Sequence, residues 1–319
     1  MMMQIVHDAP APRSTESRET LKFMSVKQVA DYLSLNEKKI YALVREGKIP
    51  ATKITGKWLF PRELVDGWLM ESSHGGLLTD RLVIAGSDDP LLNRLVTTLA
   101  GDVGSRVLVS YSPTGTRLGL ELLAALRADI SCLHWGPDNE SHIRHPALLK
   151  PYRQHHNWLL VRAFRREQGI MLRPGLLAER EREHLDVDRF LHKPWRWSTR
   201  QQGAGSQRFL LETLSLHGIK ESVLNVTRIA HTEREAAAHV AMGLADLAPG
   251  VRASATEFGL DFLHTGWEAF DLALPRGVYF RALFQKLLEN LRSRQAQDLS
   301  SELGGYDLSG CGDLLWGME

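Results

Sequence analysis

The fold of the N-terminal part follows from residues 24–69, which read MSVKQVADYLSLNEKKIYALVREGKIPATKITGKWLFPRELVDGWL. Ser25, with Gln28 three residues later, forms a capping box. This box predicts an amphipathic helix over Val26–Leu33, because apolar residues recur there at helical spacing. After a two-residue turn, an asparagine cap begins a second helix over 36–46. These residues therefore predict two short helices joined by a tight turn.

A hairpin and a third helix follow. Residues 49–54 and 58–60 are strand-like and flank a turn at 55–57. Pro61 precedes a helix over 62–70, since proline suits the first turn of a helix. The order of helix, turn, helix, hairpin and helix is that of a winged helix-turn-helix, whose second helix can enter a major groove.

Charge in this block favours a nucleic-acid partner. Residues 21–72 hold nine Lys and Arg against six Asp and Glu, and the cations gather on the second helix and the hairpin. A small helical domain used for protein contacts would also expose charges, but the element order favours DNA. The side chains expected to contact DNA are Lys38, Lys39, Tyr41, Arg45, Lys53 and Lys57.

The same stretch resembles the excisionase-type, MerR-like winged helix-turn-helix family. The family pattern S-V-x-x-V-A-x-Y-L stands at 25–33 and I-Y-x-L-V-x-x-G-x-I-P at 40–50. The pattern W-x-F-x-x-x-x-L-x-x-W-L stands, with few departures, at 58–69. The resemblance implies base reading by the second helix and phosphate contacts by the wing.

The whole chain has an ordinary globular composition. Its 319 residues are 43% hydrophobic and 24% charged, with 39 Lys and Arg against 38 Asp and Glu. These values exclude a chain disordered throughout and a disulfide-stapled miniprotein. The apolar runs are far shorter than the roughly 20 residues that span a bilayer. Cys132 and Cys311 form no C-x-x-C motif and no secretory signal is visible, so we expect a cytoplasmic protein without a membrane partner.

Changes in composition divide the chain. Residues 1–20 predict a disordered tail, 21–72 the winged helix-turn-helix domain and 73–79 a linker. From Arg81 onward, short strand-like runs alternate with helical stretches, which predicts an α/β domain over 80–319. The fold class is therefore multidomain.

Four loops in the α/β part are suited to a small polar ligand. They cover residues 85–90, 112–116, 200–206 and 245–246, and the first three open helices. Backbone N–H groups and hydroxyls at helix starts can converge on an anion. One such loop is weak evidence, because Ser and Gly cap most helices for structural reasons; several in one domain favour a site.

The order of these motifs resembles the periplasmic-binding-protein-like, type 2 domain found fused to helix-turn-helix regulators and to molybdopterin-biosynthesis-like proteins. Residues 87–90 match S-H-D-P with Asp88 for His, and residues 200–206 match R-Q-x-G-S-G-T. The resemblance implies two lobes, the first about 80–163 plus a C-terminal return and the second about 164–275, with a ligand between them. The ligand-binding positions it implies are Ser87, Asp88, Gly115, Thr116, His134, Arg200, Gln201, Gly203, Gly205, Ser206, Asp246 and Glu268.

Two ligand classes remain open. Helix starts and hydroxyls favour a molybdate- or tungstate-like oxyanion. The carboxylate of Asp88 repels a dianion unless Arg117 or Arg200 offsets it, so a small organic acid or a zwitterion also fits. The spacing His142-x-x-His145 makes a zinc or copper site conceivable, but we assign no metal and no certain cofactor.

These features predict a one-component transcriptional regulator. We expect a homodimer on double-stranded DNA, at a palindromic operator, controlled by a small effector. No nucleophile–base pair is visible, so we do not expect an enzyme. The alternatives are a molybdenum-cofactor-related ligand-binding or enzyme-accessory protein and an excisionase-like architectural DNA-binding protein.

Overall fold

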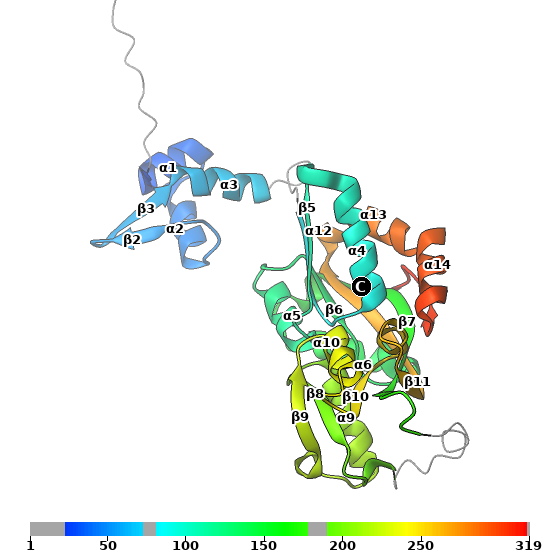
Figure 1. The fold of residues 1–319 in the computed structure, drawn as a ribbon. Coiled ribbons are helices and arrows are strands. Elements are labelled where there is room, and N and C mark those ends of the chain that lie inside the picture. Colours follow the sequence, from blue (N-terminus) through cyan, green and yellow to red (C-terminus); the bar gives the residue numbers. More distant parts are fainter. Residues whose placement is uncertain (1–22, 73–80, 178–189, 318–319) are drawn as a thin grey trace, which may run out of the picture. The chain divides into compact units, whose positions relative to one another are not determined.

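The chain forms two compact units, Met1–Thr79 and Asp80–Glu319. The computed structural model describes residues 23–72, 81–177 and 190–317 (Figure 1). The tail expected over 1–20 and the linker expected over 73–79 lie outside the described residues. Within the described ranges, no helix combines the length and the apolar character needed to cross a membrane.

The N-terminal unit is a winged helix-turn-helix. Its elements are β1 (Phe23–Ser25), α1 (Val26–Leu33), α2 (Glu37–Arg45), β2 (Thr52–Ile54), β3 (Lys57–Pro61) and α3 (Arg62–Ser72). The helices and the hairpin lie where the sequence predicts them. The short strand β1 was not predicted; it pairs with β3, so the wing is a three-stranded sheet in the order β1-β3-β2.

Local hydrogen bonds explain where the two helices begin. The Ser25 N–H donates to Gln28 Oε1 at 2.8 Å and the Gln28 N–H donates to Ser25 Oγ at 3.3 Å, so the capping box is confirmed. The Lys39 N–H donates to Asn36 Oδ1 at 2.8 Å at the start of α2. The helices, the wing and α3 share one core that includes Val29, Ala30, Ile40, Phe60 and Val65.

The C-terminal unit is α/β. Its first part holds β4 (Arg81–Gly86), α4 (Pro90–Val103), β5 (Leu108–Ser112), α5 (Thr116–Ala124), β6 (Ile130–Leu133), α6 (Ser141–Leu149) and β7 (Trp158–Leu172). Next come β8 (Arg196–Arg200), α9 (Gly205–Leu216), β9 (Asn225–Ala230), α10 (Glu233–Ala241), β10 (Leu247–Val251), α11 (Arg252–Glu257) and β11 (Asp261–Pro275). The last elements are α12 (Arg276–Tyr279), α13 (Ala282–Leu291), α14 (Arg294–Leu303), β12 (Tyr306–Asp307) and β13 (Leu314–Trp316).

One curled sheet runs through this unit, in the order β5-β4-β6-β11-β7-β10-β8-β9. The parallel strands β4, β5 and β6 lie on one side of the antiparallel pair β7 and β11, and we call this side lobe one. The strands β8, β9 and β10 lie on the other side, which we call lobe two. The long strands β7 and β11 cross from one lobe to the other, which is the expected two-lobed arrangement (Figure 1).

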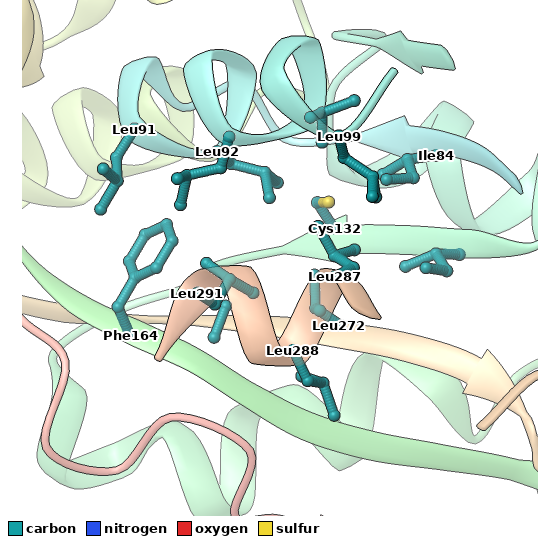
Figure 2. Packing of buried hydrophobic residues seen from close by; sticks show 14 of the residues in the cluster. Ile84, Leu91, Leu92, Leu99, Cys132, Phe164, Leu272, Leu287, Leu288 and Leu291 are labelled. Carbon is teal, nitrogen blue, oxygen red and sulfur yellow. The ribbon is translucent and has the colours of Figure 1, made fainter. Parts of the chain in front are cut away.

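Lobe one packs around α4 and α13. Leu91, Leu92 and Leu99 of α4 lie in one buried cluster with Leu287 and Leu291 of α13, with apolar side chains of the sheet beside them (Figure 2). Lobe two has separate, smaller apolar cores on the two sides of its strands. Each lobe therefore has an apolar core of its own, and the residues where the two lobes meet are not part of either core.

Candidate functional site

The second helix and the wing of the N-terminal unit frame one hollow. It has a volume of about 600 Å³ and is lined by Glu37, Lys38, Tyr41, Val44 and Arg45 of α2 and by Lys53 and Trp58 of the wing. Four of the six residues predicted to contact DNA therefore lie on one surface. The other two, Lys39 and Lys57, are exposed on the same elements but do not line the hollow.

Trp58 was missed in the sequence as a member of this surface. The Lys53 ammonium lies over its ring, 5.6 Å from the ring centre, and this contact holds a cation beside α2. The alternation of apolar and polar residues along β3 could have placed Trp58 on the face shared with Lys53, since the two residues pair across the hairpin.

In the C-terminal unit, the loops after β4 and β5 meet at the edge of lobe one. Ser87 Oγ lies 2.8 Å from Thr116 Oγ1, and both side chains are buried. The Gly115 N–H donates to the carbonyl of Gly86 at 2.8 Å. The two loops therefore place hydroxyls at the starts of α4 and α5, as the sequence predicts.

Lobe two meets these loops directly. Asp88 Oδ2 accepts a hydrogen bond from the Glu233 N–H at 2.6 Å, so a lobe-one carboxylate lies at the start of α10. Gln201 Nε2 donates to the carbonyl of Thr114 at 3.3 Å, and the Arg117 N–H donates to the carbonyl of Gly203 at 3.5 Å. These bonds join the two lobes across the predicted cleft.

His134 of lobe one also lies close to Gly205 of lobe two. A Cβ atom added to Gly205 would lie 1.9 Å from His134 Nε2, so only glycine fits at the start of α9. The other ring nitrogen of His134 contacts Arg166, since Arg166 Nη2 lies 3.0 Å from His134 Nδ1. Burial, together with the Arg166 charge, holds the pKa of His134 well below its usual range, so the imidazole is neutral.

A buried arginine organises the floor of the cleft. Arg166 Nε donates to Glu268 Oε1 at 2.8 Å, and Arg166 Nη1 donates to Asp89 Oδ2 at 2.9 Å and to the carbonyl of Asp88 at 2.8 Å. Burial raises the pKa of Glu268 to about 7, although Arg166 opposes the shift. Burial and the nearby Glu233 carboxylate likewise raise the pKa of Asp88 to about 6.

On the lobe-two side, Arg200 and Glu233 face each other. Arg200 Nε lies 3.7 Å from Glu233 Oε1, and Ser206 Oγ donates to the same carboxylate oxygen at 2.5 Å. Arg200 is only 4% exposed, yet its Nε and Nη1 atoms have no hydrogen-bond partner among the described residues. Unpaired buried donors are costly unless an acceptor reaches them.

The comparisons with known proteins identify both units. A family model described as a PBP superfamily domain matches residues 99–292, which is more than half of the chain. The chain belongs to the PBP superfamily. A helix-turn-helix domain model matches residues 23–73, so a PBP-like domain and a helix-turn-helix domain share one polypeptide. No protein with a curated description matches the chain.

Solved structures resemble the PBP-like domain in fold. A Clostridium perfringens protein with bound phosphate, described as a phosphate ABC transporter substrate-binding protein, is 10% identical with a TM-score of 0.52; the match covers 72% of this chain and 100% of that one. The tungstate ABC transporter structure of Geobacter sulfurreducens is 13% identical over 70% and 98% of the two chains, with a TM-score of 0.47. The CcmR regulatory domain of Synechocystis PCC6803 with 2-PG is 12% identical over 66% and 95%, also with a TM-score of 0.47.

One predicted cleft residue lies elsewhere in the PBP-like domain. Asp246 Oδ1 and Oδ2 accept hydrogen bonds from Arg196 at 2.8 and 3.1 Å. Arg196 begins β8, whereas the cleft residues follow the end of that strand, so the placement of Asp246 in the cleft was wrong. The loop that does reach the cleft precedes α10 instead, at 230–233.

Several cleft residues of the PBP-like domain were missed in the sequence: Asp89, Arg166, Glu233 and Tyr306. Arg166 stands inside a strand whose other buried residues, apart from Gln168, are apolar or glycine, which is a signal for a buried charge with a partner. Thr232 is an N-cap residue that marked the start of α10, since its Oγ1 accepts a hydrogen bond from the Glu235 N–H at 2.9 Å. Nothing in the sequence near Tyr306 connects it to Asp89, because the contact spans most of the domain.

The histidines considered for a metal site are used in other ways. His145 Nδ1 lies 2.6 Å from Asp271 Oδ2, and its Nε2 accepts a hydrogen bond from the Trp135 N–H. His142 is exposed on the same helix, α6. Among the described residues, no group of three or more His, Cys, Asp or Glu side chains has an arrangement that could hold a metal ion.

Proposed function

We propose that this protein is a DNA-binding transcription regulator whose PBP-like domain senses a small anion. The observation that carries the proposal is the presence of a helix-turn-helix domain and a PBP-like domain on one chain. A PBP-like domain binds its ligand between two lobes, and lobe closure is a mechanical change that can be passed to a DNA-binding partner domain.

For DNA binding, we propose that α2 enters the major groove and that the wing contacts phosphates. The hollow between α2 and the wing combines three cations with Tyr41, and phosphate contacts dominate affinity for DNA. The test is a fluorescence-anisotropy titration with DNA selected from a random pool. Lys38→Ala and Lys53→Ala should each weaken binding and lower the salt slope by about 0.9.

Lys150→Ala, an exposed change in the other unit, is the matched control and should leave both values unchanged. Unchanged affinity and slope in both interface variants would remove this surface from the DNA complex.

For the ligand, the unpaired donors of Arg200 support an anion. The guanidinium lies beside Ser206 at the start of α9, and helix starts favour negative charge. The Asp88 carboxylate already lies at the start of α10, so an incoming anion has to displace it or bind beside it. We therefore keep two classes: a molybdate- or tungstate-like oxyanion, and a small organic anion or zwitterion.

Calorimetry on the full chain separates these classes. Molybdate, tungstate and phosphate form one set, and amino and sulfonic acids form the other. Arg200→Gln should abolish binding of the true ligand class, because the shorter amide stays polar but carries no charge. If Asp88→His gains oxyanion binding that the wild type lacks, the natural ligand is not an oxyanion. Absence of binding by both sets would refute the anion proposal.

We also propose a homodimer on a palindromic operator, because one winged domain offers a small contact area. Sedimentation of the protein, free and with operator DNA, tests this part independently. A monomer in both cases would refute it.

A further inference from the structure

A second hollow lies beside the cleft, on the flank of the PBP-like domain. Its volume is about 490 Å³, and it runs between α9, the loop at Gly136 and the crossing strand β11. A hollow of this size is in the range that holds small molecules. It shares Glu268 with the cleft but otherwise uses residues that the proposed function does not involve.

The floor of this hollow, which we call the flank groove, holds an amide with no partner. Gln168 lines the groove and is 3% exposed, and neither its Nε2 nor its Oε1 atom has a hydrogen-bond partner among the described residues. An amide buried in this way costs free energy for both its donor and its acceptor. A ligand that offers one acceptor and one donor side by side would satisfy both atoms.

The backbone beside Gln168 leaves room for such a ligand. Gly266 pairs with Gln168 across β7 and β11, so the two residues share one face of the sheet. A Cβ atom added to Gly266 would meet nothing within 4 Å. On the same face, Glu268 accepts a hydrogen bond from Arg166 through Oε1.

The side chains that line the groove indicate the shape and the charge of the ligand. Phe209, Leu263 and Trp267 are half-buried and supply apolar and aromatic surface. The described lining residues include Glu212 and Glu268 but no lysine or arginine, which disfavours an anion. Arg166 beneath Glu268 disfavours a cation there.

We infer that the flank groove is a second binding site, for a neutral planar molecule whose edge carries an amide-like donor and acceptor. Gln168 pairs with that edge, and the aromatic walls cover its faces. The site adjoins the anion cleft at Glu268, but the neutral probes do not depend on Arg200, so it can be tested whether or not an anion binds.

The test is calorimetry on the full chain with probes of one shape and different charge. Benzamide, nicotinamide and uracil represent the proposed class, and benzoate and benzamidine are charged counterparts of benzamide. At least one neutral probe should bind the wild type, and benzoate and benzamidine should bind at least tenfold more weakly than benzamide.

Two variants localise the binding. Gln168→Met keeps the side-chain length and removes both polar atoms, so it should weaken binding at least tenfold while the melting temperature stays equal or rises. Gly266→Leu should fill the open space and abolish binding. Gly101→Leu, at another open glycine on the exposed face of α4, is the matched control and should bind as the wild type does.

Failure of all three neutral probes to bind the wild type would overturn the inference. Binding that survives both Gln168→Met and Gly266→Leu, or benzoate binding as tight as that of benzamide, would overturn it as well.

Discussion

Asp88 shows how one residue changes the chemistry of a cleft. Its carboxylate accepts from the N–H at the start of α10, a position suited to an anion. Burial and the Glu233 carboxylate raise its pKa to about 6, so at neutral pH the site holds a charge that folding disfavours. The protein thus places a carboxylate of its own at a helix start, which is a position that favours negative charge.

We predict that Asp88→Asn removes a pH dependence of stability. The pKa of Asp88 is about 6 in the folded state and 3.8 ordinarily, so the folded state binds the proton more tightly. Its contribution to stability is therefore largest below pH 4 and is lost as pH rises to about 6. In urea unfolding, Asp88→Asn should be about 3 kcal/mol more stable at pH 7 and nearly unchanged at pH 3.5. An equal decline with pH in both proteins would contradict this account.

Leu126 has a strained backbone conformation. It follows α5 with a φ of 58°, in the left-handed region, and its side chain is 73% exposed. A glycine adopts this conformation without a Cβ penalty. We predict that Leu126→Gly stabilises the PBP-like domain by about 0.5–1 kcal/mol in chemical denaturation. Leu126→Ala keeps the Cβ atom and should give no gain; equal gains in both variants would exclude backbone strain as the cause.

At the scale of elements, α2 depends on its cap for its position beside the wing. The helix has nine residues, and its apolar contacts involve Ile40, Leu43 and Val44. Helices this short are marginal without tertiary contacts and caps. The asparagine at position 36 therefore matters for the orientation of the side chains that α2 presents to the hollow.

We predict that Asn36→Ala destabilises the helix-turn-helix unit by about 1 kcal/mol, because the Lys39 N–H loses its acceptor. Thermal unfolding followed by circular dichroism measures the change. Asn36→Ser keeps a side-chain acceptor and should stay within a few tenths of a kcal/mol of the wild type. A loss of the same size in Asn36→Ser would show that the cap is not responsible.

At the scale of the whole PBP-like domain, the two lobes meet at His134 and Gly205 as well as through hydrogen bonds such as the one between Asp88 and the Glu233 N–H. His134 cannot simply turn away, because it lies against Arg166 in a buried network. A methyl group at position 205 would therefore push the lobes apart rather than shift one side chain.

We predict that Gly205→Ala costs about 1–3 kcal/mol and enlarges the radius of gyration, because the lobes cannot close. In a His134→Ala background the imidazole is gone, so adding Gly205→Ala should cost almost nothing. A double-mutant cycle with urea unfolding and X-ray scattering measures this coupling. Additive effects of the two changes would show that the contact does not hold the lobes together.

The local elements could be read from the chain because their signals are local. The helix Val26–Leu33 follows from the Ser25 box and a four-residue apolar spacing, which act within one or two turns. The strands Arg81–Gly86 and Ile130–Leu133 follow in the same way from short apolar runs bounded by turns. Ser87 and Thr116 could be paired because both follow parallel strands, whose ends meet at one edge of a sheet.

Contacts between distant segments had no such signal. Asp246 follows a helix and precedes a strand, as a ligand loop might, but strand direction places it at the opposite end of lobe two beside Arg196. The partners of Arg166 come from the loops after β4 and β6 and from β11. The open space above Gln168 depends on the register that sets Gly266 opposite it. Propensity and spacing act over a few residues, whereas burial, pKa shifts and cavities arise only when the folded chain brings distant residues together.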